Sequence, residues 1–218
     1  MLAELYVKEI GKCLQAMIEK EKENIAEIAE TVAERVALGG TIHLLDHGHL
    51  LGAEMTARAG GLALIHTIRV DDVKNPVIVR PADVLFIASV SGRSRSLVEA
   101  ALLAKKRGVF TVALTSSAQN GVTEPEDPKL GLLPGATDRV LDIQGVAGDA
   151  ILRENDASKP FIPASGILSV ALMWSLVAEL VGALRRKGIE PTIYTSVNVP
   201  GGQEAFESEV KRYSELGY

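Results

Sequence analysis

The 218-residue sequence has little cysteine, no excess of positive charge and no recognisable export signal. Its single cysteine, Cys13, cannot form a disulfide within the chain. No charged start followed by an apolar run and a small-residue cleavage site opens the sequence, so we expect a cytoplasmic protein. The 28 Asp and Glu residues outnumber the 23 Lys and Arg residues, which argues against nucleic acid as a partner. Any anionic ligand must therefore be held by local geometry.

Several widespread ligand-binding motifs are also missing. The sequence has no G-x-x-x-x-G-K-[ST] loop for nucleotide triphosphates and no G-x-S-x-G hydrolase elbow. Residues 46–52, DHGHLLG, differ from a dinucleotide-binding loop because Asp46 stands at the first glycine. An uncharged run over residues 161–178 comes near the length of a membrane span, but Pro163 and Gly166 fall in its first turn and Glu179 ends it. We expect a buried core helix there and no membrane contact.

The first pattern that the sequence does contain is helical. Apolar residues recur at helical intervals over residues 3–37, and Gly39-Gly40 ends the pattern. One helix of this length would run on the order of 50 Å at about 1.5 Å per residue, so we expect a break near residues 19–23. Its excess apolar face predicts contact with a partner subunit in a homodimer or homotetramer. Residues 1–38 are therefore interpreted as an N-terminal helical arm of a single domain whose ligand-binding part is residues 39–218.

After residue 40, short apolar runs alternate with helical stretches. The runs are continuous, which is typical of strands covered on both faces. The predicted fold class is therefore α/β, a doubly wound three-layer sandwich with a mainly parallel central sheet. We expect a long loop at residues 117–137, strands over residues 41–45, 63–68, 83–90, 109–115, 139–143 and 192–197, and helices over residues 49–59, 96–107 and 164–186 and from about residue 203.

One strand-to-helix corner, IASVSGRSRSLVEA at residues 87–100, is unusually rich in hydroxyl groups. Ser96 and Glu99 have the spacing of a capping box, which accounts for one serine. The other three, with Gly92, could direct hydroxyl and amide donors at an anion beside the positive end of the helix. The alternative is that they only complete a turn. Their clustering at this corner favours anion binding, through Ser89, Ser91 and Ser94.

This corner resembles the S-x-S-G-x-[TS] signature of the sugar isomerase (SIS) domain, whose Ser and Thr side chains bind the phosphate of phosphosugars. The similarity extends over residues 46–62, 87–116, 148–150 and 196–202, and it is greatest to a subgroup often labelled phosphoheptose isomerases. The resemblance implies an SIS fold and a sugar phosphate ligand. It implies phosphate or sugar contacts from Gly48, Arg58, Ser89, Ser91, Gly92, Arg93, Ser94, Ser116 and Ser165.

Histidines and a carboxylate follow the first predicted strand. His47 and His49 should face the same mouth as the serines if the two strands are neighbours, and imidazole can transfer protons near neutrality. Glu54 and Arg58, four residues apart, would share one helix face, where a simple salt bridge is the alternative to a functional role. In phosphoheptose isomerases such a Glu and Arg belong to the active site. That resemblance makes Glu54 the first candidate for the catalytic base, assisted by His49 or His47.

A second candidate for the base is Glu179. The isomerase domain of glucosamine-6-phosphate synthase carries a catalytic Glu on its late helix, and Glu179 has a similar place. The alternative is a solvent-facing acid near Arg186.

Two further features bear on function. The first loop of SIS proteins usually reads G-x-G-H-S, but here Leu50 replaces the serine and cannot hydrogen-bond a ligand. We therefore keep two hypotheses, an aldose-ketose isomerase and a phosphosugar-binding or sensing module without turnover. Zinc held by His47, His49 and Glu54 is conceivable. The loop does not itself fix tetrahedral spacing, so no cofactor is expected.

Overall fold

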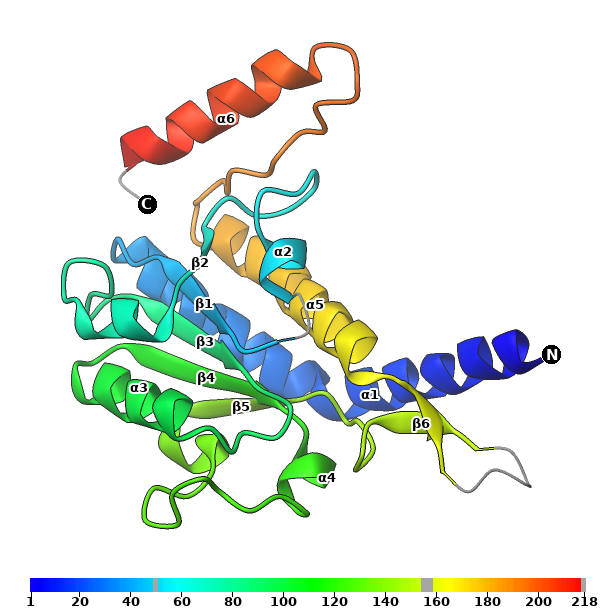
Figure 1. The fold of residues 1–218 in the computed structure, drawn as a ribbon. Coiled ribbons are helices and arrows are strands. Elements are labelled where there is room, and N and C mark those ends of the chain that lie inside the picture. Colours follow the sequence, from blue (N-terminus) through cyan, green and yellow to red (C-terminus); the bar gives the residue numbers. More distant parts are fainter. Residues whose placement is uncertain (49–50, 154–158, 217–218) are drawn as a thin grey trace.

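The structure, a computed structural model, describes residues 1–48, 51–153 and 159–216. A five-stranded sheet in the order β2-β1-β3-β4-β5 forms its centre (Figure 1). Each neighbouring pair in this sheet is parallel. The strands are β1 (Ile42–Asp46), β2 (Ile65–Thr67), β3 (Val84–Ala88), β4 (Phe110–Thr115) and β5 (Arg139–Asp142).

Helices cover both faces of this sheet (Figure 1). On one face α1 (Leu2–Ala37) packs against α5 (Ser165–Arg186), and the short α2 (Leu51–Met55) also contacts α5. On the other face lies α3 (Arg95–Lys106), with the 3-10 turns η1 (Val70–Lys74) and η2 (Leu133–Ala136) beside it. Within β3, Phe86 packs into the first core and Leu85 into the second. The predicted doubly wound sandwich is confirmed, and burial on both faces explains the continuous apolar runs.

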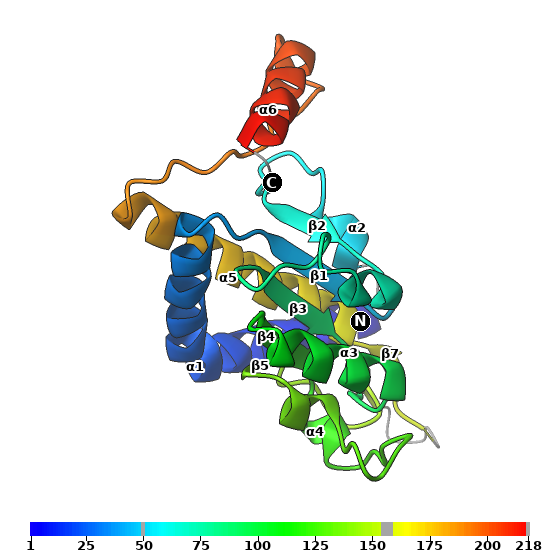
Figure 2. The ribbon, with the colours of Figure 1, turned by 90° about the vertical axis from the view of Figure 1, so that its left-hand side faces the viewer.

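The N-terminal helix differs from its prediction. α1 is a single helix of 36 residues, so the expected break is wrong. Glu21, within the segment where the break was expected, is buried and accepts a hydrogen bond from Asn24 Nδ2 at 2.9 Å. Asn24 in turn donates to the Val140 carbonyl at 2.7 Å, which fastens this charged stretch to β5. The helix instead bends while remaining helical (Figure 2).

α5 is the core helix that the sequence suggested. It is the only helix in the described part of the chain long and apolar enough to cross a membrane by length and composition, and half of that apolar window is buried inside the fold. Its buried face carries Leu168, Leu172 and Leu176 into the core shared with α1. Burial against α1 accounts for the apolar residues of this face.

The remaining elements lie outside the two main layers. The short helix α4 (Ser117–Asn120) follows β4, within the stretch predicted as a long loop that also holds η2, and β6 (Ala150–Leu152) pairs antiparallel with β7 (Phe161–Pro163). α6 (Gly202–Leu216) follows an extended segment at the edge of the fold (Figures 1 and 2), where its buried Tyr213 packs beside His66, with ring centroids 5.1 Å apart.

Two other element predictions need correction. The strand expected at residues 192–197 is reduced to a bridge between Leu62 and Ile193, because this segment pairs with the loop at residues 60–63 and does not join the sheet. The helix expected at residues 49–59 is assigned only over Leu51–Met55 in the described part, and Ala57 with its φ of 52° cannot continue it.

Candidate functional site

The candidate site lies where β1 and β3 end side by side. Strand order reverses between these two neighbours, because the chain passes from β1 to β2 on one side and from β3 to β4 on the other. In open α/β sheets, ligands bind at such a switch point, beyond the carboxyl ends of the strands. The two loops start in contact, since the His47 amide donates to the Ala88 carbonyl at 3.1 Å. A small cavity of about 10 Å³ opens there, lined by Asp46, Gly48, Leu51, Ala88, Ser89, Val90, Leu114 and Ser169.

The loop after β3 is folded around its glycine. Gly92 has a φ of 61°, in the region that favours glycine, and its amide donates to the buried Ser89 Oγ at 3.2 Å. The Gly92 carbonyl accepts from the Leu133 amide at 2.9 Å, which ties the loop to η2. A side chain at this position would lie only 3.2 Å from Asn120 Nδ2. Close packing therefore fixes the curved path of the loop.

This curved path leaves several hydrogen-bond donors without acceptors. The backbone amides of Ser91, Arg93 and Ser94 donate no hydrogen bond within the described residues. The half-buried Ser91 hydroxyl likewise makes no hydrogen bond in this part of the chain, and the side chain of Arg93 is exposed. These groups lie directly before the N-terminus of α3, which is the arrangement that attracts anions.

The predicted capping box at Ser96 is wrong. The N-cap of α3 is Ser94, two residues earlier, and the Ser94 and Ser96 hydroxyls lie 3.0 Å apart. Glu99 instead pairs with Arg95, whose Nε lies 2.8 Å from Oε1. The Arg95 amide is capped from outside the helix, by the Glu126 carboxylate at 2.9 Å.

Two residues that sequence reasoning missed hold the serine loop in place. Asn120 Nδ2 donates to the Ser91 carbonyl at 2.9 Å, and the Glu126 amide donates to the Arg93 carbonyl at 3.1 Å. Both come from the stretch expected to be an irregular loop. Its acidic composition was the available signal for Glu126, whereas nothing in the sequence singled out Asn120.

Ser116 and Ser165 are engaged with the protein itself. Ser116 is buried, and its hydroxyl caps α4 by accepting from the Gln119 amide at 3.3 Å. The buried Ser165 Oγ donates to Asp149 Oδ2 at 2.7 Å, and the Ser165 amide donates to Oδ1 of the same carboxylate at 2.7 Å. Asp149, another residue that sequence reasoning left without a role, thereby caps the start of α5.

The residues after β1 are placed at the mouth of the site. His47 and Gly48 are exposed there, and Gly48 has a φ of 95°. Glu54 is half-buried on α2, and its Oε2 lies 2.6 Å from Arg58 Nη1, so the ion pair weighed as the alternative is present. His49 lies outside the described residues.

The zinc prediction remains untested. The described residues hold no group of three or more His, Cys, Asp or Glu side chains that could bind a metal ion. His49, which that prediction requires, lies outside those residues, as does Leu50.

Glu179 lies apart from the serine loop. It is exposed on α5, in a groove of about 360 Å³ that it lines with Ile18, Ile25 and Ser175. Ser169, which lines the switch-point cavity, is ten residues earlier in the same helix. At about 1.5 Å per residue, roughly 15 Å separates the two positions along the helix.

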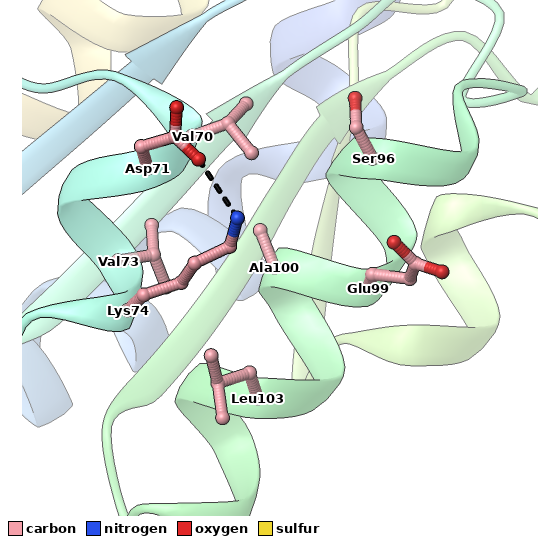
Figure 3. Close-up of a pocket in the computed structure, with 8 residues that line it drawn as sticks. All are labelled: Val70, Asp71, Val73, Lys74, Ser96, Glu99, Ala100 and Leu103. Carbon is pink, nitrogen blue, oxygen red and sulfur yellow. Dashed lines mark hydrogen bonds and ion pairs between the residues drawn. The ribbon is translucent and has the colours of Figure 1, made fainter.

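A separate cavity of about 350 Å³ lies between η1 and α3 (Figure 3). Ala100 and Leu103 contribute apolar side chains to it, and the ion pair between Asp71 and Lys74 spans 2.8 Å beside it. Ser96 lines this cavity, but the three serines of the proposed anion site do not. The hydroxyls of the corner thus divide between two surfaces.

At the amino ends of the strands, His43 and Asp83 form a buried pair. His43 Nε2 lies 3.1 Å from Asp83 Oδ2, and the Thr41 and Arg80 amides also donate to this carboxylate. Burial acts to raise the pKa of Asp83, but these hydrogen bonds outweigh it and lower the pKa to about 2. Burial, followed by the nearby His43, lowers the pKa of His66. These groups belong to the scaffold.

Comparison with known proteins agrees with this geometry. The SIS domain family matches residues 5–73 and 69–116 of the chain. A UPF0309 protein of Geobacillus kaustophilus is 33% identical over 235 residues, covering 96% of this chain and 93% of that protein. The Vibrio vulnificus NanR protein complexed with ManNAc-6P has a TM-score of 0.54 at 16% identity, covering 99% of this chain and 68% of the NanR chain. Phosphoheptose isomerase from Neisseria gonorrhoeae has a TM-score of 0.50 at 18% identity, covering 84% of this chain and 96% of the isomerase.

The two structures share the fold of this chain at low sequence identity. The family match covers β1, β3, α3 and the serine loop between those last two elements. The relative from Geobacillus extends the similarity over nearly the whole sequence. The resemblance inferred from the serine signature is thereby confirmed, and the chain belongs to the SIS domain family.

Proposed function

We propose that the chain binds the phosphate of a sugar phosphate at residues 89–94 and interconverts its aldose and ketose forms. The observation that carries this proposal is the set of unsatisfied amides at Ser91, Arg93 and Ser94 before the N-terminus of α3. Phosphate offers several acceptor oxygens to such donors, and the dipole of α3 favours its charge. Membership of the SIS family and the phosphosugar bound to NanR support the same ligand class.

The isomerisation requires one base that moves a proton between neighbouring carbons. A carboxylate removes the proton from the carbon beside the aldehyde, an enediolate forms, and the same proton returns to the former carbonyl carbon, while the hydroxyl proton of the second carbon passes to the oxygen of the first. Glu54 is the better candidate within one chain, because α2 begins at Leu51, which lines the switch-point cavity, whereas Glu179 lies in a separate groove. Arg58 holds the Glu54 carboxylate at 2.6 Å. His47, exposed at the mouth, or His49 would assist ring opening.

Thermal-shift measurements with a panel of hexose and heptose phosphates test the binding step. We expect stabilisation of the native chain and its loss in Ser91→Ala, because that substitution removes a hydroxyl donor from the phosphate site. Ser117→Ala, which changes an exposed serine at the start of α4, is the matched control and should keep the shift. A ligand whose stabilisation is undiminished in Ser91→Ala would show that the Ser91 hydroxyl does not bind the phosphate.

Turnover measurements test the chemistry. Glu54→Gln should lower the rate by about a hundredfold to ten-thousandfold while the ligand still binds, since a positioned base contributes that much. Glu179→Gln should have little effect. Unchanged rates in both variants would show that neither Glu54 nor Glu179 is the base. Binding without any turnover across the panel would instead establish the alternative, a sensing module, which the loss of the usual serine at Leu50 favours.

We also propose that two or four chains associate in the cytoplasm. The first half of α1 exposes Leu2, Leu5, Val7 and Ile18, and an apolar helix face is stabilised by burial. Light scattering should give a multiple of the 23.2 kDa chain mass, and Val7→Asp should shift the population toward monomers. A monomer at all concentrations would contradict this proposal.

A further inference from the structure

The carboxylate of Asp46 has two oxygens in different surroundings. Asp46 is the last residue of β1, and its Oδ2 accepts a hydrogen bond from the Gly52 amide at 2.9 Å. This bond fastens the start of α2 to the end of the strand. The other oxygen, Oδ1, is buried and has no hydrogen-bond partner within the described residues. One oxygen therefore has a structural role, and the other has no partner among the residues that the structure describes.

Asp46 lines the small cavity at the switch point. Most of the cavity wall is apolar, and besides the Asp46 carboxylate its polar side chains are Ser89 and Ser169, both largely buried. Its volume of about 10 Å³ is close to the space that one water-sized group needs. This space suffices for a single hydroxyl, ammonium group or water.

An unpaired carboxylate oxygen in such a place is unfavourable, because burial removes its water without supplying a donor. The position of Asp46 shows where the donor would come from. Asp46 pairs in register with Ala88, which directly precedes the serine loop. A ligand whose phosphate is held by residues 89–94 would place its sugar portion beside the end of β1. A carboxylate there repels phosphate but accepts hydrogen bonds from the polyol end.

We propose that Asp46 is a specificity-determining residue, whose Oδ1 accepts a hydrogen bond from one hydroxyl or ammonium group of the bound sugar phosphate. This inference rests on the proposed phosphate site, and it divides recognition between two loops. The loop after β3 binds the phosphate, and the last residue of β1 selects ligands that present a hydrogen-bond donor to the cavity.

Asp46→Asn tests the proposal with almost no change of shape. The amide oxygen of Asn can still accept from the Gly52 amide, while its NH₂ group places a donor where Oδ1 was an acceptor. Calorimetric titrations would use inorganic phosphate and four sugar phosphates: glucose, deoxyglucose, glucosamine and sedoheptulose, each phosphorylated on its terminal hydroxyl. We expect the tightest-binding sugar phosphate to lose about ten- to a hundredfold in affinity in the variant, with inorganic phosphate unchanged. A larger loss for glucosamine phosphate than for glucose phosphate identifies the donor as ammonium, and equal losses identify a hydroxyl.

Asp142→Asn is the matched control, because Asp142 also ends a strand but its Oδ1 accepts from the Ser117 and Gln144 amides. It should leave the order of affinities unchanged. Ser169→Val gives a second test that fills the cavity from α5 without touching the Gly52 contact, so the proposal remains testable if Asp46→Asn folds poorly. It should weaken the sugar phosphates and spare inorganic phosphate.

The outcomes separate this inference from the proposed function. Sugar phosphate affinities within twofold of the native values in Asp46→Asn and Ser169→Val would overturn the role of Asp46. If Ser91→Ala still abolished binding in that case, the phosphate site would stand without it. If none of the probes bound the native chain, both the proposed phosphate site and the proposed role of Asp46 would be wrong.

Discussion

Replacing Gly92 with Ala should destabilise the protein through two separable effects. The φ of 61° at this position lies in the left-handed region, which costs a residue with a Cβ about 1–2 kcal/mol. The added methyl would also lie 3.2 Å from Asn120 Nδ2 and 3.3 Å from Leu133 Cβ. Crowding of this kind in a packed region typically costs about 1–3 kcal/mol. We expect a total loss of about 2–5 kcal/mol in the free energy of unfolding.

Two other glycines of the same region supply the controls. Gly131 has a φ of 73° but open space around it, so Gly131→Ala should show the backbone effect alone, about 1–2 kcal/mol. Gly135 has neither a positive φ nor a close neighbour, and Gly135→Ala should change stability by well under 1 kcal/mol. The difference between Gly92→Ala and Gly131→Ala therefore isolates the effect of packing around the serine loop.

Urea unfolding followed by circular dichroism measures all three free energies. For a slope of about 2 kcal/mol per molar urea, Gly92→Ala should lower the midpoint by about 1 M or more. Affinity for inorganic phosphate should fall as well, because a shift of the loop moves its free amides. If Gly92→Ala were no more destabilising than Gly131→Ala, the argument that close packing fixes this loop would be refuted.

Three further predictions concern the scaffold. Asp83→Asn should remove about 2 kcal/mol from the free energy of unfolding near neutral pH, measured by urea unfolding. The folded pKa of about 2 lies below the usual 3.8, so the native chain should lose the same contribution as the pH falls from about 4 to 2. His66 has a lowered pKa, so the unfolded chain binds its proton more readily; the melting temperature should fall as the pH drops below about 6.5, and less so in His66→Gln. Asp149→Ala should cost about 1–2 kcal/mol by uncapping α5, whereas Asp149→Asn, which retains an acceptor, should cost less in the same urea assay.

The parts of the fold that sequence predicted correctly are those that depend on burial. β3 lies between β1 and β4 with helices on both faces, so each of its side chains is buried and the run is apolar throughout. The serine corner was also predictable, because a strand, a glycine and a helix start follow one another within a few residues. Both signals are local, and they are visible without knowing what packs against them.

The parts that sequence missed depend on distant partners. Nothing near residues 19–23 shows that Asn24 will reach the Val140 carbonyl and keep α1 continuous. The start of α3 is likewise decided by Glu126, which lies 31 residues from Arg95 and caps its amide. The spacing of Ser96 and Glu99 fits a capping box, but Glu99 pairs with Arg95 instead. Local spacing is a weak guide wherever a remote side chain can compete for the same group.

With the phosphate site and the sugar contact proposed above, the switch point lets phosphate recognition and sugar recognition vary independently. Neighbouring strands β1 and β3 bring Asp46 and Ser89 to one cavity, but the loops that follow them lead to different helices and are fastened by different residues. The Gly52 amide of α2 donates to Asp46 at the end of β1, whereas Asn120 and Glu126 hold the serine loop after β3. A substitution in the first loop therefore leaves the donors of the second in place. Variants at Asp46 should change which sugar phosphate binds, and variants at Ser91 should change whether any binds.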